Sequence, residues 1–65
     1  MKKNDPLIEE LREVMKEKSL STIVASKFVE AAPKSISRWL NYEARPMMIY
    51  RKAIKRGIKR MERLP

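Results

Sequence analysis

Hydrophobic residues recur in the first third of the chain at the spacing of an amphipathic helix. Asp5 and Pro6 predict its start, because an Asp side chain caps free backbone N–H groups and Pro tolerates the first helical position. The apolar positions that follow share one helical face: Leu7, Ile8, Leu11, Val14 and Met15. The opposite face mixes acids and bases, such as Glu9 and Arg12 at a helical spacing, and we expect it to be solvated and without a function of its own.

Two shorter helices are predicted next. Ser21 is a cap for a helix from Thr22 to about Val29, and Pro33 closes a tight connection and begins a third helix that extends to about Asn41. The apolar set of the second helix is Ile23, Val24, Ala25, Phe28 and Val29. The third helix is expected to turn three side chains inward, Ile36, Trp39 and Leu40. Its outward positions are Lys34, Ser35, Ser37, Arg38 and Asn41.

A fourth helix is expected to begin at Pro46, after a loop over 41–45, and to extend to about Glu62. Its apolar or small residues recur every three to four positions: Met47, Tyr50, Ile54, Gly57, Met61 and Leu64. Gly57 weakens this seam but permits the close approach of another backbone. We expect the first turns of this helix to complete the core, and its end to form a dimer contact or to clamp phosphates.

Length and charge restrict the class of protein. A chain of 65 residues holds one domain, residues 1–65, with one small core. The formal net charge is +8, and residues 45–65 contain eight basic residues against one acid. Such an excess favours polyanionic partners, with nucleic acid first and an anionic membrane surface second.

Several functional classes are disfavoured by what the sequence lacks. Without Cys or His, it offers no disulfide, no usual zinc ligand set and no apparent nucleophile or acid–base pair, so we expect no enzyme activity and no metal or other cofactor. No apolar stretch approaches the roughly 20 residues that cross a bilayer, and residues 1–6 do not resemble a signal peptide. A cytoplasmic, nucleoid-associated protein is therefore expected, and without a sensing domain we expect no small-molecule ligand.

Residues 22–41 fit a helix-turn-helix template of twenty positions. The buried positions of the template hold Ala25, Val29, Ala31, Ile36 and Trp39. Two helices that cross at roughly 90 to 120° through a tight turn need small residues at the crossing and apolar anchors beneath the second helix. Only then does the second helix project far enough to enter a major groove about 12 Å wide.

The run SLSTIVASKFVEAAPKSISRWLNYEARP resembles the helix-turn-helix core of the Cro and phage-repressor (Xre-type) family. The pattern Ser-Ile-Ser-Arg-Trp at residues 35–39 is followed by Asn41, Arg45 and Pro46 at nearly the family spacing. Glu30 and Tyr42 stand where the family usually has Gly. The resemblance implies an all-α, lambda-repressor-like domain, a three-helix core with a basic C-terminal helix, and a repressor-like regulator of transcription that binds double-stranded DNA sequence-specifically.

The same resemblance implies roles for individual residues. The outward residues Lys34, Ser35 and Arg38 would face base edges or flanking phosphates, as would Ser37. Arg38 is the main specificity candidate, because a guanidinium bonds both N7 and O6 of guanine. Phosphate contacts are expected from Ser21 and Thr22 at the start of the second helix and from Asn41 and Arg45 after the third. The basic C-terminal helix adds four candidates for phosphate or dimer contacts: Arg51, Lys52, Lys55 and Arg56.

Two further expectations concern partners. A homodimer would place two recognition helices about 34 Å apart on a palindromic site and compete with polymerase. The alternative to a sequence-specific regulator is a nonspecific RNA or DNA binder, or an anionic membrane-surface binder. In such a protein the basic helix would dominate binding and the helix-turn-helix would serve as scaffold.

Overall fold

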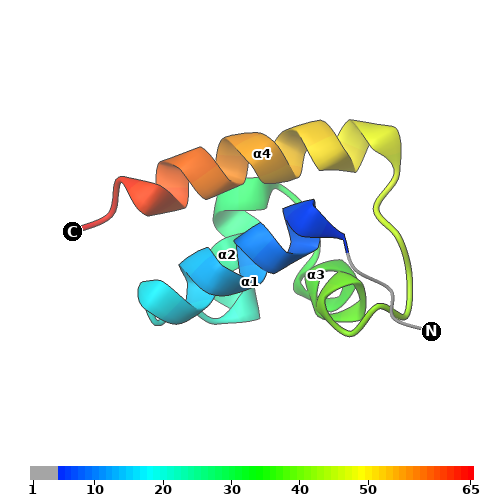
Figure 1. Ribbon diagram of the computed structural model, residues 1–65, viewed down its shortest axis with the longest axis horizontal. Coiled ribbons are helices and arrows are strands. Elements are labelled where there is room, and N and C mark those ends of the chain that lie inside the picture. The colour runs from blue at the N-terminus through cyan, green and yellow to red at the C-terminus, as the bar shows by residue number, and fades with distance from the viewer. Residues whose placement is uncertain (1–4) are drawn as a thin grey trace.

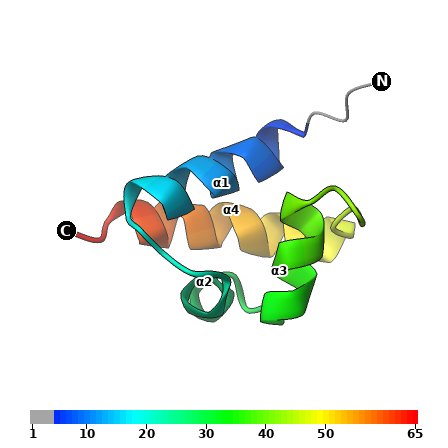
Figure 2. The same cartoon turned by 90° about the horizontal axis from the view of Figure 1, so that it is seen from below.

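The helices formed by residues 5–65 pack around one hydrophobic core. The structure, a computed structural model, describes residues 5–65, which form α1 (Pro6–Glu17), α2 (Thr22–Val29), α3 (Pro33–Leu40) and α4 (Met48–Glu62) and no strand. α4 runs along the longest axis of the molecule, 36 Å, and the other helices lie beneath it in Figure 1. Seen from below, α3 lies in front of α4, and α1 and α2 lie on either side of it (Figure 2). The all-α expectation is confirmed.

Local hydrogen bonds explain where the first two helices begin. The Asp5 side chain accepts a hydrogen bond from the Leu7 N–H at 3.1 Å, and the Ser21 hydroxyl accepts one from the Val24 N–H at 3.2 Å. Both predicted caps are confirmed. The predicted start of the last helix is two residues early, because Pro46 lies in an extended, buried segment and Met47 is the N-cap of α4.

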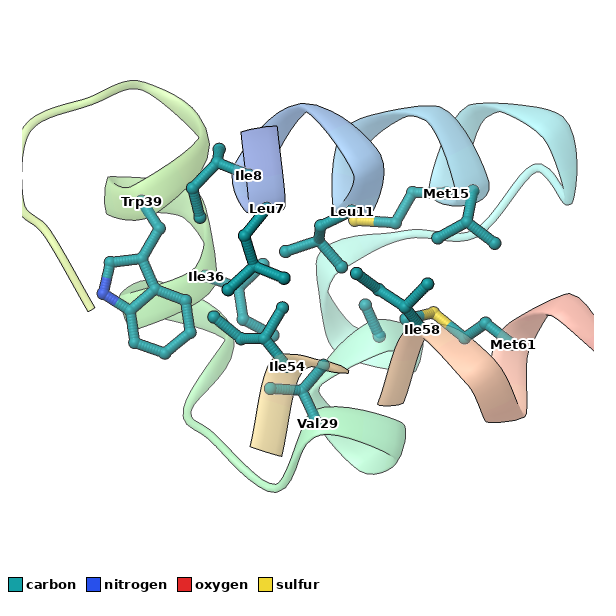
Figure 3. Close-up of a cluster of buried hydrophobic side chains, with 12 residues drawn as sticks. Leu7, Ile8, Leu11, Met15, Val29, Ile36, Trp39, Ile54, Ile58 and Met61 are labelled. Atoms are coloured by element: carbon teal, nitrogen blue, oxygen red, sulfur yellow. The ribbon is translucent and has the colours of Figure 1, made fainter. Parts of the chain in front are cut away.

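A single apolar cluster joins all four helices (Figure 3). Its buried members are Leu7, Ile8, Leu11, Val14, Met15, Ala25, Val29, Ile36, Trp39, Ile54, Ile58 and Met61. The five apolar positions predicted for α1 are all buried, and so are Ile36 and Trp39 of α3. Burial of each large aliphatic side chain contributes roughly 1.5–3 kcal/mol, so this cluster is the main source of stability in a chain without disulfides.

The expectation of which part of α4 completes the core was wrong. Its first turn does not complete the core, because Met47, Met48 and Ile49 are 67%, 74% and 71% exposed. The middle and end of the helix complete it instead, through residues that include Ile58, which the predicted seam omits, and Met61. The reason is visible in Figure 1, where α4 begins beyond the ends of α1 and α2, the helices on which it packs.

The apolar set predicted for α2 is only partly buried. Ala25 and Val29 are fully buried and Phe28 is half-buried, whereas Ile23 and Val24 are exposed. A helix of eight residues that packs on α3 and α4 turns only a narrow face inward, and Ile23 and Val24 fall outside that face.

The single glycine lies where two helices come into contact. A Cβ atom at Gly57 would lie 2.7 Å from Cγ2 of Val29 and 3.0 Å from the Phe28 carbonyl oxygen. The C-terminal end of α2 therefore packs directly on the backbone of α4. The close approach expected at this glycine occurs within the chain.

Candidate nucleic-acid interface

The buried side chains of α3 determine which of its faces is exposed. Ile36 is fully buried and Trp39 is 4% exposed. The Trp39 ring also packs on the Tyr50 ring of α4, with centroids 5.4 Å apart and a tilt of 53°. In Figure 3, Ile36 lies beside Ile54, and Trp39 lies at one end of the cluster. Because these anchors share one side of an eight-residue helix, the other side faces outward.

The connection from α2 to α3 changes the direction of the chain within three residues (Figure 2). Glu30 adopts a left-handed conformation, with φ 64° and ψ 45°, and its N–H donates to the Ser26 carbonyl at 2.9 Å. Ala32 is extended, as the following Pro33 requires. A left-handed residue other than glycine costs roughly 1–2 kcal/mol, so the packing of α2 and α3 maintains this turn against a local preference.

A polar cluster on α1 positions the other end of α3. The Tyr42 hydroxyl donates to the Glu9 carboxylate, and the Arg12 guanidinium donates to the Leu40 carbonyl at the last residue of α3. The Arg12 guanidinium also lies 5.9 Å from the centroid of the Tyr42 ring. The hydrogen bond to Glu9 raises the pKa of the Tyr42 phenol above its ordinary value of 10.0. The face of α1 that was expected to be merely solvated therefore helps to hold α3 in place.

Tyr42 itself has a left-handed backbone, with φ 59°. Both positions at which the resembled pattern usually has glycine, Glu30 and Tyr42, thus adopt the conformation that glycine accommodates most easily. Glu9, Arg12 and Tyr42 were not among the predicted site residues. The sequence shows Glu9 and Arg12 as an ordinary intrahelical pair, and their nitrogen–oxygen distance is indeed 3.6 Å, but it does not show which distant residue lies above them.

The predicted contact residues of α3 and its flanks differ in exposure. Lys34, Arg38 and Asn41 are exposed, as are Ser21 before α2 and Arg45 in the loop after α3. Thr22, Ser35 and Ser37 are partly exposed. Within residues 5–65, neither Lys34 nor Arg38 forms an ion pair, so both cations are available to an external anion.

The basic residues of α4 fall into two kinds. Lys52, Lys55 and Arg56 are exposed, and no acid within the described range forms an ion pair with them. Arg51 instead donates to both oxygens of Asp5, at 2.8 and 3.2 Å. These hydrogen bonds hold the pKa of the Asp5 carboxyl below its ordinary value of 3.8. Arg51 therefore fastens α4 to the start of α1 in this structure.

None of the four helices in the described part of the chain is long and apolar enough to cross a membrane. Comparison of the chain with known protein families, with characterised proteins and with solved structures gave no match.

Proposed function

We propose that the protein binds double-stranded DNA sequence-specifically as a helix-turn-helix regulator of the Cro and phage-repressor type, with α3 in the major groove. The observation that supports this most is the division of α3 into two faces. Ile36 and Trp39 anchor it in the core, while Lys34 and Arg38 extend from the opposite face without ion-pair partners among residues 5–65.

The dimensions of α3 suit a major groove. An α-helix with its side chains is about 10–12 Å across, and the groove is about 12 Å wide and 8.5 Å deep. A recognition helix must also have its backbone held in place, because ordering a mobile segment on binding costs free energy. The left-handed turn at Glu30 and the bond from Arg12 to the Leu40 carbonyl restrain both ends of α3.

Each exposed residue has a separate role in the proposal. Arg38 reads guanine through N7 and O6, a contact that discriminates between bases by about 1–3 kcal/mol. Lys34, at the start of α3, lies near base edges or the phosphates beside them. Asn41 and Arg45, which follow α3, and Ser21, which precedes α2, bind phosphates and set the register of the protein on the duplex.

The proposal includes a homodimer on a palindromic operator, acting as a repressor in the nucleoid. The exposed apolar residues Met47, Met48 and Ile49 at the start of α4 favour contact with a second copy. Sedimentation of the free protein and of its complex with a palindromic duplex tests this part. Two chains per duplex support it, and one chain bound to a single half-site contradicts it.

Selection from a random DNA pool at about 0.15 M salt tests the function itself, because salt weakens phosphate attraction more than base recognition. The expected result is a short consensus that contains guanine. A recovered pool as random as the starting pool would contradict sequence-specific binding.

A further inference from the structure

The outer face of α4 carries a continuous basic stripe. Its six members recur every three or four residues, and all are exposed: Lys52, Lys55, Arg56, Lys59, Arg60 and Arg63. None of them forms an ion pair with an acid in residues 5–65. At about 1.5 Å per residue the stripe extends over roughly 16 Å of helix. It is the largest concentration of positive charge in the sequence.

This basic stripe and the exposed face of α3 point to different sides of the molecule. Ile54, Ile58 and Met61 turn the inner face of α4 toward the same core into which α3 inserts Ile36 and Trp39. In Figure 1, α4 lies along the top and α3 at the lower right, and in Figure 2 α3 lies in front of α4. Since both helices direct their buried faces to one core from different sides, their outer faces diverge. A straight duplex that contacts Lys34 and Arg38 therefore does not lie along the basic stripe.

We infer that the basic stripe binds the phosphate backbone of a second DNA duplex, so that the protein bridges two DNA segments. This rests on the proposed function, which assigns the first duplex to α3. Lysine and arginine side chains that neutralise phosphates release condensed counterions, and the logarithm of the affinity then falls with the logarithm of salt by about 0.9 per phosphate. Binding at the stripe is sequence-independent, because the stripe is the solvent side of a helix held flat on the domain and does not project as α3 does.

The packing of α4 favours DNA over a lipid surface. An amphipathic helix binds a membrane by burying its apolar face in the headgroup region. The apolar face of α4 is already covered, since Ile54, Ile58 and Met61 are at most 2% exposed. Only the first turn, with Met48 and Ile49, offers exposed apolar side chains on this helix beside the charges.

The test is a capture assay with two duplexes. A duplex with the sequence selected for α3 is immobilised, and we measure both the protein retained on it and the capture of a labelled duplex of unrelated sequence. The wild-type protein is expected to be retained and to capture the second duplex. The Lys55→Gln/Lys59→Gln variant is expected to be retained equally but to capture at least about tenfold less of the labelled duplex, because two phosphate contacts are lost.

A matched control separates the basic stripe from net charge. Lys16→Gln/Lys27→Gln removes the same two charges at exposed positions on α1 and α2 and is expected to capture the second duplex as the wild type does. Equal loss of capture in both double variants would overturn the inference, because net charge alone would then explain it.

Other outcomes distinguish the alternatives. Retention of the wild type without capture overturns bridging and leaves the proposed function intact, whereas failure of retention contradicts the proposed function. Capture that survives Lys55→Gln/Lys59→Gln but is lost in Met48→Ser/Ile49→Ser would show that a second protein copy joins the duplexes, which overturns a site on the stripe. In a further outcome, the protein captures no second duplex but sediments with phosphatidylglycerol-containing vesicles in a manner that requires Lys55 and Lys59. That result would overturn the inference and assign the stripe to membranes.

Discussion

Arg51 in α4 donates two hydrogen bonds to Asp5, the N-cap of α1, at 2.8 and 3.2 Å, across 46 positions of sequence. The Asp5 carboxylate thus caps α1 and also binds α1 to α4. Because Arg51 stabilises the ionised form, the pKa of Asp5 is lower in the folded protein than its ordinary 3.8. The unfolded chain then binds more protons, so the stability from this pair is complete above about pH 5 and is lost as the pH falls through 3.8 toward the lower folded-state pKa.

Asp5→Asn isolates the ion pair from the cap, because Asn caps a helix about as well as Asp. We expect the variant to lose up to about 1 kcal/mol of unfolding free energy at pH 7, since the pair is partly exposed to solvent. The loss should shrink as the pH falls from 5 to 3, as measured by urea unfolding. Glu13→Gln, which removes an exposed acid of α1, is the control and should cost little. An equal loss in both variants would mean that the pair adds nothing beyond its charge.

Glu30→Gly should stabilise the protein. Glu30 has φ 64°, a region that glycine adopts without the Cβ clash of other residues. We expect a gain of about 0.5–1 kcal/mol in thermal or urea unfolding, after the entropy that glycine adds to the unfolded chain. Glu30→Ala removes the same carboxylate but retains a Cβ, so it should show no such gain. A gain of the same size in the alanine variant would point to charge and away from backbone strain.

Gly57→Ala should destabilise the protein, although alanine inside a helix normally gives about 1 kcal/mol more stability than glycine. The new Cβ would lie 2.7 Å from Cγ2 of Val29 and 3.0 Å from the Phe28 carbonyl oxygen, which belongs to the backbone of α2 and cannot rotate away as a side chain can. A loss of about 1–3 kcal/mol is expected from this overpacking. Lys55→Ala compared with Lys55→Gly gives the ordinary difference at an exposed site of the same helix. If Gly57→Ala raises stability by that difference, the contact between α2 and α4 is looser than described.

Periodicity and caps predicted much of this fold. The start of α1 and the bounds of α2 and α3 agree with expectation to about a residue, because Asp5, Ser21 and Pro33 act locally. The inward position of Ile36 and Trp39 also follows from spacing along one short helix. These features depend only on neighbours in sequence.

What could not be predicted depends on contacts between distant residues. The exposure of Met48 follows from how far α4 extends past α1 and α2, a distance that no local pattern encodes. Likewise, Glu9 and Arg12 have the spacing of a solvated pair, and only the fold brings Tyr42 and the Leu40 carbonyl to them. Arg51 appears in the sequence as one more cation of a basic run, and only the tertiary structure shows that it forms an ion pair with Asp5.

In the proposed complex, Arg38 reads bases from the exposed face of α3. The most direct measurement is the ratio of affinities for a selected duplex and an unrelated duplex at about 0.15 M salt, compared between Arg38→Ala and Lys16→Ala, which each remove one positive charge from an exposed position. We predict that Arg38→Ala lowers this ratio roughly 5- to 150-fold, which corresponds to the loss of about 1–3 kcal/mol of base discrimination, while Lys16→Ala leaves it unchanged. An unchanged ratio in Arg38→Ala, or an equal fall in both variants, would contradict base recognition by Arg38.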